Sequence, residues 1–241
     1  NMIYDSILKT KKKQLALLID PDKHNEKSLI EVSKLAQLHK VDFILVGGSL
    51  LSNDISESIQ TIKKEYSSPV ILFPGSASQV SPYADAILFL SLISGRNPEF
   101  LIGNHVIAAP AIKKSQLEVI PTGYILIDCG ATTSVEYMSN TRPIPAHKPD
   151  IAIATALAGE MLGLQLLYIE GGSGAQTHIN PQIIRGIKQN CSIPIIVGGG
   201  IRTPETLHAI YEAGADIAVV GTIIEKNPAI LERMMQIADC F

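Results

Sequence analysis

The sequence is poor in the residues that mark disulfide-bonded or metal-binding proteins. It has no tryptophan and only three cysteines, Cys129, Cys191 and Cys240, whose spacing matches no metal-binding motif. An odd number of scattered cysteines is typical of a protein from a reducing compartment. No signal peptide is recognisable. We therefore expect a cytoplasmic protein.

Neither positive nor negative charge dominates the sequence. Its 20 lysines and arginines nearly balance 23 acidic residues, which gives a formal net charge of −3. The basic residues between positions 9 and 13 stand beside no nucleic-acid-binding motif, and such a run more often forms a solvated face. We therefore expect no nucleic-acid partner.

The sequence has no uninterrupted apolar run long enough to cross a membrane. Residues 151–169 come near that length, but Gly159, Glu160 and Gly163 interrupt them. A helix over residues 150–162, followed by a buried strand over 165–169, explains this composition better. Motifs for covalent catalysis are also missing: no nucleophile elbow surrounds a serine, and no lysine lies inside an apolar strand.

What the sequence has is a repeated alternation of short apolar runs with segments of helical composition. Each run ends in Gly, Pro, Ser or Asp, as buried parallel strands do. The predicted strands are residues 15–19, 43–46, 70–73, 86–90, 124–127, 165–169, 195–197 and 216–220.

Eight such strands predict a single (β/α)8 TIM barrel over residues 2–241. A doubly wound open sheet is the alternative, but polar strand ends recur along the whole chain rather than near one switch point. We expect a long polar loop over residues 130–148, which is functional or mobile. Asn1, ahead of Met2, we interpret as a residue left over from cloning.

The loops after the last two strands predict a phosphate site. Gly199 and Gly200 follow the seventh strand, and a helix start at residues 203–205 follows them. Gly221 and Thr222 follow the eighth strand. In (β/α)8 barrels these two loops often hold a phosphate, because glycines let backbone N–H groups approach it. The alternative is that these glycines only form turns.

The ends of the first two strands offer ligands for a divalent cation. Asp20 ends the first strand and Ser49 follows the second. Mg²⁺ takes one or two carboxylates and completes its shell with water and substrate phosphates. The alternative is that Asp20 or Asp22 only caps the next helix. Lys23 either binds a phosphate or is solvated.

The end of the sixth strand carries the candidate catalytic group. The period of two places Tyr168 and Glu170 on one face of that strand. Glu170 could orient or deprotonate a substrate hydroxyl, and the following Gly-Ser-Gly run could add N–H groups to the phosphate site. The alternative is a salt-bridged glutamate at the rim.

Five of these segments together resemble the family of geranylgeranylglyceryl phosphate synthases and their heptaprenyl-using bacterial relatives. They are LIDPDK (18–23), VGGS (46–49), YIEGGSG (168–174), VGGGIR (197–202) and VGT (220–222). They span most of the chain, although the last two occur in many phosphate-binding barrels. Leu18 stands where Bacillus-type members carry a lysine, which indicates the archaeal and Bacteroidetes-like group.

The resemblance implies an Mg²⁺-dependent prenyltransferase that makes the first ether bond of archaeal-type lipids. Such an enzyme joins sn-glycerol 1-phosphate to a prenyl diphosphate. It implies that Asp20 and Ser49 contact Mg²⁺. Members of this group are commonly dimers or hexamers. The residues that it assigns to glycerol 1-phosphate are Tyr168, Ile169, Glu170, Gly171, Gly172, Ser173, Gly174, Gly199, Gly200, Gly221 and Thr222.

The second substrate would be a lipid diphosphate. Lys23 and Arg96 are weaker candidates to bind its diphosphate. Residues 100–102 and Tyr124 are candidates to line a groove for its apolar tail, and filling that groove near Phe100 should shorten the accepted chain. Peripheral contact with a membrane is plausible for such a substrate.

Three other functions remain open from the sequence. A flavin-dependent barrel enzyme would use the same glycine loops for FMN phosphate, and it would be yellow. A sugar-phosphate isomerase or a related phosphate enzyme is the second. A sensor that binds a phosphate ligand without turnover is the third; in a sensor, Glu170→Ala should reduce affinity at most.

Overall fold

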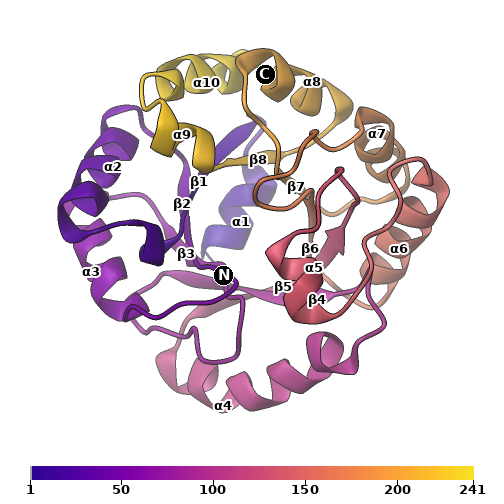
Figure 1. The fold of residues 1–241 in the computed structure, drawn as a ribbon, viewed down its shortest axis with the longest axis horizontal. Coiled ribbons are helices and arrows are strands. Elements are labelled where there is room, and N and C mark those ends of the chain that lie inside the picture. The colour runs from indigo at the N-terminus through magenta and orange to yellow at the C-terminus, as the bar shows by residue number, and fades with distance from the viewer. Residues whose placement is uncertain (1) are drawn as a thin grey trace.

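The computed structural model describes residues 2–241; Asn1 lies outside the described residues. Eight parallel strands close into a barrel in chain order, with β1 paired to β8, which confirms the predicted (β/α)8 barrel (Figure 1). The strands are β1 (Gln14–Ile19), β2 (Phe43–Val46), β3 (Val70–Leu72), β4 (Ala86–Leu92), β5 (Glu118–Leu126), β6 (Leu166–Glu170), β7 (Ile195–Gly198) and β8 (Ile217–Val220).

Helices surround the barrel, and short ones stand at the end where the strands finish (Figure 1). The outer helices are α2 (Glu26–Leu38), α3 (Ile55–Glu65), α4 (Asn104–Ser115), α6 (Pro149–Met161), α7 (Pro181–Asn190), α8 (Pro204–Ala213) and α10 (Ile230–Asp239). The short ones at that end are α5 (Ser134–Ser139), α9 (Thr222–Lys226), a 3-10 turn (Pro21–Lys23) and a π-helical turn (Glu99–Gly103), and α1 (Met2–Lys9) lies at the opposite end. Within residues 2–241, no helix is both long and apolar enough to cross a membrane.

The structure corrects two of the expected elements and adds one helix. The polar loop over 130–148 contains α5, where Thr133 accepts a hydrogen bond from the Glu136 N–H. Threonine followed three residues later by glutamate is a capping box, which the polar composition had obscured. Strand β5 begins at Glu118 rather than Tyr124. Helix α1 was not predicted at all.

One β/α unit lacks its helix. A loop joins β3 to β4 over residues 73–85 without a helix, next to α4 (Figure 1). Ala77, Val80 and Ala84 of this loop pack against the core in place of a helix. An apolar cavity, described below, occupies this region.

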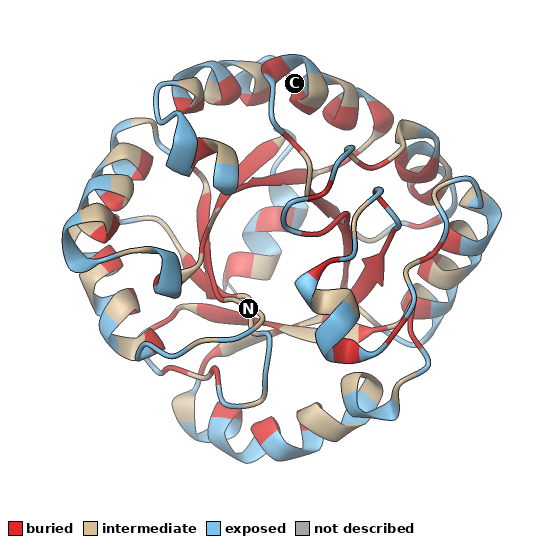
Figure 2. Cartoon of the chain, in the orientation of Figure 1, coloured by how far each residue is buried: buried red, intermediate tan, exposed pale blue. Residues whose placement is uncertain are grey.

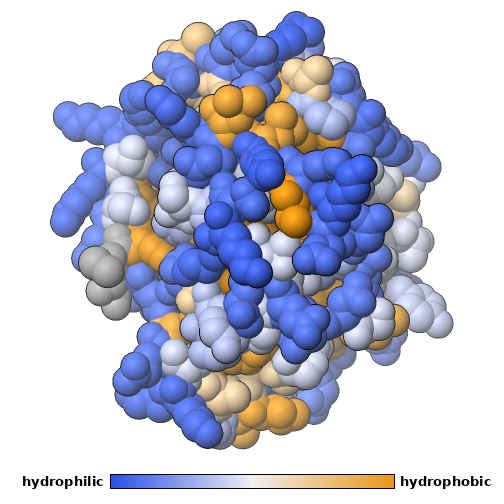
Figure 3. Space-filling model, turned by 90° about the vertical axis from the view of Figure 1, so that its left-hand side faces the viewer, coloured by the Kyte–Doolittle hydropathy of each residue, from blue (hydrophilic) through white to orange (hydrophobic). Residues whose placement is uncertain are grey.

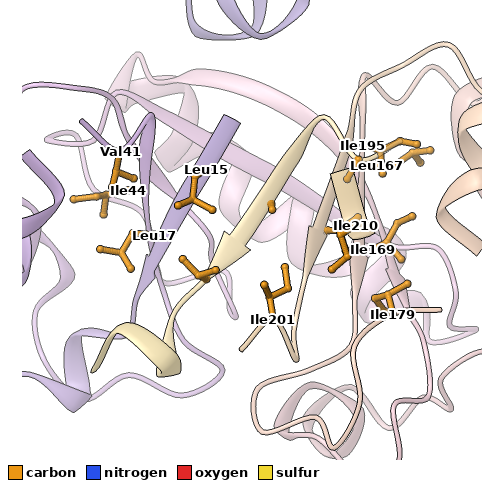
Figure 4. Close-up of a cluster of buried hydrophobic side chains, with 14 of the residues drawn as sticks. Leu15, Leu17, Val41, Ile44, Leu167, Ile169, Ile179, Ile195, Ile201 and Ile210 are labelled. Atoms are coloured by element: carbon orange, nitrogen blue, oxygen red, sulfur yellow. The ribbon is translucent and has the colours of Figure 1, made fainter. Parts of the chain in front are cut away.

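The core has two layers. One lies between strands and helices and includes strand residues such as Leu15 and Ile169 and helix residues such as Ile210 (Figure 4). The other fills the barrel interior with alternate strand residues, among them Leu88 and Tyr168. Figure 2 shows the resulting burial of all eight strands. A filled interior makes the barrel a rigid support for its loops.

Helix α1 lies across the end of the barrel where the strands begin. Ile3 and Ile7 join the interior cluster, and the Tyr4 hydroxyl donates to the Gln165 carbonyl oxygen at 2.9 Å. The Glu118 carboxylate accepts from the Ile3 and Tyr4 N–H groups, both at 2.9 Å. Glu118 therefore caps the helix from a distant strand, which explains why local sequence patterns did not reveal α1.

Replacing Glu118 with alanine is expected to lower the free energy of unfolding by about 1–2 kcal/mol, the usual cost of a lost N-terminal cap. Urea unfolding would measure it. Glu31→Ala, on the exposed face of α2, serves as the control. Catalysis should not change, because α1 covers the end of the barrel opposite the site described next. Unchanged stability would show that Glu118 does not hold α1.

Candidate active site

The strands end around a polar cavity of about 1230 Å³, its open mouth included, which is ample for a small-molecule ligand. It brings together most of the residues predicted from the sequence. Those lining it are Asp20, Lys23, Ser49, Tyr168, Glu170, Gly172, Ser173, Gly174, Gly199, Gly200, Gly221 and Thr222. Two predicted neighbours lie behind them: Ile169 packs toward the helices (Figure 4), and the Gly171 N–H donates to the Gly198 carbonyl oxygen.

Glu170 is the last residue of β6 and is only 6% exposed. Burial raises the pKa of its carboxyl to about 7, against the opposing effect of the Gly172 N–H and of the Tyr124 and Tyr168 phenols. The Gly172 N–H donates to Oε1 at 2.5 Å. A carboxyl with a pKa near neutrality can exchange a proton with a substrate at physiological pH.

Tyr168 lies beside Glu170 within an aromatic cluster. Its ring stacks on Phe73 with centroids 4.9 Å apart, and the Tyr124 ring lies 5.4 Å away. Within the described residues, its fully buried hydroxyl makes no hydrogen bond, although the phenol lies near enough to Glu170 to oppose the rise of that carboxyl's pKa. Because buried hydroxyls normally have a partner, this one can bond to the Glu170 carboxylate after a small shift, or to a ligand.

The glycine loops can present backbone N–H groups to an anion. Gly174, Gly199 and Gly200 have φ angles of 81°, 85° and 73°, which favour glycine. A Cβ at Gly199 would lie 2.7 Å from Glu170 Oε1, so a side chain there would crowd the carboxylate. Among residues 2–241, no acceptor pairs with these three N–H groups.

The structure corrects one expectation, that the Gly172 N–H binds the substrate phosphate. This N–H lies in the Gly-Ser-Gly run, all of which was expected to serve the phosphate. It donates instead to Glu170, because the turn after β6 folds back onto the carboxylate. The remaining N–H groups of the run stay available.

Asp20 combines two roles that the sequence left as alternatives. Its Oδ1 accepts from the Asp22 N–H at 3.2 Å, so it caps the short turn that follows. It also lines the cavity, where Gly48 faces it so closely that a Cβ would lie 3.0 Å from Oδ1. The close approach of Gly48 brings the loop that carries Ser49 beside the carboxylate.

The donor set fits a sparsely held Mg²⁺. Within residues 2–241, no group of three or more His, Cys, Asp or Glu residues could hold a metal by itself. One carboxylate and one hydroxyl are nevertheless enough where substrate phosphates complete the shell. Asp20 and Ser49, both lining the cavity, could hold such an ion.

Three basic side chains line the cavity, Lys23, Arg202 and Lys226, and only Lys23 was predicted. Its Nζ lies 3.9 Å from Asp20 Oδ2. Arg202 donates to the Ala175 and Gln176 carbonyl oxygens and so fixes the loop after β6; Lys226 belongs to α9. Arg96 does not line the cavity, since its guanidinium donates to the Gly95 carbonyl oxygen at 2.8 Å. The position of Arg202 two residues after the glycine run could have revealed it.

An apolar cavity of about 820 Å³, its open mouth included, adjoins the polar one, and the two share Ser49, Phe73, Tyr124 and Val135. It extends between β4 and α4 beside Leu88, Ala108 and Ile112. Phe100 and Tyr124 line it as the groove prediction required. Leu101 and Ile102 do not, and Ile102 is 59% exposed.

Comparison with known proteins identifies the family. The PcrB family matches residues 7–239. The chain belongs to the PcrB family. Within this family, the protein is 52% identical over 238 residues to geranylgeranylglyceryl phosphate synthase of Chitinophaga pinensis, covering 97% of this chain and 94% of that protein. It is 42% identical to the synthase of Methanosphaera stadtmanae, with 92% and 91% covered.

A solved structure of similar shape carries a ligand. It is (S)-3-O-geranylgeranylglyceryl phosphate synthase from Thermoplasma acidophilum in complex with its substrate sn-glycerol-1-phosphate. The PcrB chain superposes on it with a TM-score of 0.93 at 34% identity, covering 99% of each chain. The comparisons thus agree with the family that the sequence motifs indicated.

Proposed function

We propose that the protein joins sn-glycerol 1-phosphate to geranylgeranyl diphosphate, or to a similar prenyl diphosphate, through an ether bond. The observation that carries this proposal is the continuity of the two cavities beside Glu170. A polar cavity with free N–H groups suits a glycerol phosphate, and an adjoining apolar cavity suits an isoprenoid tail. The relatives that bear the name of this synthase support the same assignment.

The residues of the polar cavity have distinct roles in substrate binding and proton transfer. The N–H groups of Gly174, Gly199 and Gly200 hold the phosphate, which leaves the far hydroxyl of the glycerol near Glu170. The hydroxyl oxygen forms a bond to the allylic carbon while the bond from that carbon to the diphosphate oxygen breaks. The proton of the hydroxyl passes to the Glu170 carboxylate. Tyr168 donates its free hydroxyl to the substrate and helps to orient it.

The diphosphate lies toward Lys23, near Asp20 and Ser49. Mg²⁺ bound there would neutralise the charge that develops on the departing diphosphate. Lys23 contributes a further positive charge from the side of the cavity.

The prenyl tail occupies the apolar cavity. Replacing Ala108, which lines it on α4, with phenylalanine is expected to shift the preferred substrate from geranylgeranyl to farnesyl diphosphate. A larger side chain shortens the space without touching the polar site. The measurement is kcat/KM with prenyl diphosphates of increasing length, with Ala108→Val as a milder control. An unchanged preference would place the tail elsewhere.

Three further properties belong to this proposal. We propose peripheral contact with a membrane, which would deliver the lipid substrate through exposed apolar residues beside the groove, Leu50 at 77% and Met138 at 50% exposure. The side formed by α2 and α3 is mainly hydrophilic with small separate apolar patches (Figure 3), which favours membrane contact at the groove.

We also propose a cytoplasmic homo-oligomer, dimeric or hexameric, supported by exposed Val106 and Ile107 on α4.

The experiment incubates the protein with geranylgeranyl diphosphate and either enantiomer of glycerol phosphate, with Mg²⁺ or with EDTA, and analyses products by mass spectrometry. Ether product from the sn-1 enantiomer alone, abolished by EDTA, is the expected result. No product with any prenyl chain from about ten to thirty-five carbons would overturn the proposal. Bound FMN, seen as a yellow protein, would then favour a flavin enzyme.

A further inference from the structure

The loop between β2 and α3 carries Ser49, and side chains from outside the loop hold it in place. It contains neither helix nor strand between Val46 and Ile55, and Leu50 within it is 77% exposed. Ser49 nevertheless borders the polar cavity, the apolar cavity and a third, hydroxyl-rich cavity beside them. If Ser49 were mobile, the cation site would keep only Asp20 as a fixed ligand. The contacts that fix this loop therefore affect cation binding.

The Asp22 carboxylate provides three of these contacts. Its Oδ2 accepts from the Ser52 N–H at 2.7 Å and from the Ser52 hydroxyl at 2.8 Å. Its Oδ1 accepts from the Asn53 N–H at 3.0 Å. Both carboxylate oxygens are therefore engaged by the loop, although Asp22 is only two residues from Asp20. Hydrogen bonds to a charged acceptor are roughly twice as strong as neutral ones.

Gln79 holds the other side of Ser49. This residue is only 4% exposed. Its side-chain N–H donates to the Gly48 carbonyl oxygen at 2.8 Å, and its carbonyl oxygen accepts from the Gly75 N–H at 3.0 Å. Ser49 thus lies between two fixed points, one at Gly48 and one at Ser52.

We propose that Asp22 is a positioning residue of the transfer reaction, which fastens the β2–α3 loop so that Ser49 meets Asp20 at the cation. It acts through hydrogen bonds to Ser52 and Asn53 and does not bind the metal itself. Residues that orient metal ligands commonly change metal affinity or activity by about 10–100-fold when they are replaced. The proposal rests on the proposed function.

The chain offers a matched control in Glu160. Its Oε1 accepts from the Ser192 N–H at 2.8 Å, the Ser192 hydroxyl at 2.5 Å and the Ile193 N–H at 3.2 Å. This is the same kind of contact as that of Asp22, a carboxylate bound to a serine and to the next N–H. Glu160 lies in the last turn of α6, and its partners Ser192 and Ile193 lie just before β7, at the opposite end of the barrel from the site.

The first readout is amide hydrogen exchange in the ligand-free protein, which needs no catalysis. In Asp22→Asn the amides of residues 49–54 should exchange at least about tenfold faster, since one carboxylate oxygen becomes an amide group that cannot accept. Ser52→Ala keeps both backbone donors and should show a smaller rise. In Glu160→Gln the exchange of residues 49–54 should match the wild type.

The second readout is the Mg²⁺ dependence of transfer. In Asp22→Asn the half-saturating Mg²⁺ concentration should rise about tenfold, while the KM for sn-glycerol 1-phosphate stays unchanged. Ser52→Ala should shift in the same direction, and Glu160→Gln should not shift. A stability effect alone would move neither quantity selectively.

Two results would overturn the proposal. Exchange of residues 49–54 that is unaltered in Asp22→Asn would show that Asp22 does not hold the loop. Loss of any Mg²⁺ response in Asp22→Asn, with Ser52→Ala unchanged, would make Asp22 a direct metal ligand. If the wild type catalyses no transfer, the proposed function fails instead, and the exchange comparison still reports on the loop.

Discussion

Replacing Glu170 with glutamine is expected to lower kcat by about 10²–10⁴-fold, the usual contribution of a general base. Glutamine keeps the shape of the side chain but cannot take the proton from the glycerol hydroxyl. The KM for sn-glycerol 1-phosphate should change much less, because the phosphate is held by the glycine loops. Steady-state kinetics and calorimetric titration with sn-glycerol 1-phosphate would separate the two effects.

Glu225→Gln is the control for this substitution. Glu225, on α9, also lines the polar cavity, but its carboxylate lies 3.9 Å from His24 Nε2. We expect near wild-type turnover for this variant. Equal losses in both variants would show that cavity charge, not proton transfer at Glu170, determines the rate.

The pH profile should reveal the same carboxylate. Burial raises the pKa of Glu170 to about 7, so the group is protonated, and unable to accept a proton, at lower pH. We expect kcat/KM to fall about tenfold per pH unit below 7 and to level off above it. In Glu170→Gln the pH dependence of the residual activity comes only from titration of the substrate phosphates, so this variant provides the baseline. A wild-type profile parallel to that baseline would contradict the role.

Replacing Asp20 with asparagine is expected to cost about 10²-fold or more in turnover, since a metal that neutralises a leaving group contributes several kcal/mol. The half-saturating Mg²⁺ concentration should rise with it. Binding of sn-glycerol 1-phosphate without metal should be retained. A metal titration monitored by initial rate would measure the first two effects, and calorimetry the third.

Asp128→Asn is the matched control for Asp20. Asp128 lies at the same end of the barrel, after β5, and accepts a hydrogen bond from the N–H two residues ahead at 3.0 Å, as Asp20 does at 3.2 Å. It does not line the polar cavity. If both variants lose the same activity, the local turns that these carboxylates hold explain the loss and the metal role does not.

The sequence was sufficient for the barrel and for most of the site because both depend on local patterns. Apolar runs placed the strands, and the period of two placed Tyr168 and Glu170 on the interior face, where the structure has them. The glycines after β7 needed positive φ angles, which their residue type already indicated. Strand ends of a closed barrel then converge by topology alone.

What the sequence did not reveal depends on contacts between distant segments. Glu118 caps α1 from more than 110 residues away, and the contacts of Asp22 with Ser52 cross about 30 residues. Neither partner carries a local pattern. Arg96 shows the converse: its place after a strand suggested a ligand contact, but its side chain closes its own turn. Positive charge near a strand end is therefore a weaker guide than glycine or an alternating carboxylate.

The most direct test of the account is a crystal structure of the protein with sn-glycerol 1-phosphate, Mg²⁺ and a non-reactive thio analogue of geranylgeranyl diphosphate. We expect the phosphate on the N–H groups of Gly174, Gly199 and Gly200, and the free hydroxyl within about 3 Å of the Glu170 carboxylate. The cation should lie between Asp20 and Ser49, with the tail beside Phe100. A hydroxyl turned away from Glu170, with the phosphate bound elsewhere, would contradict the account.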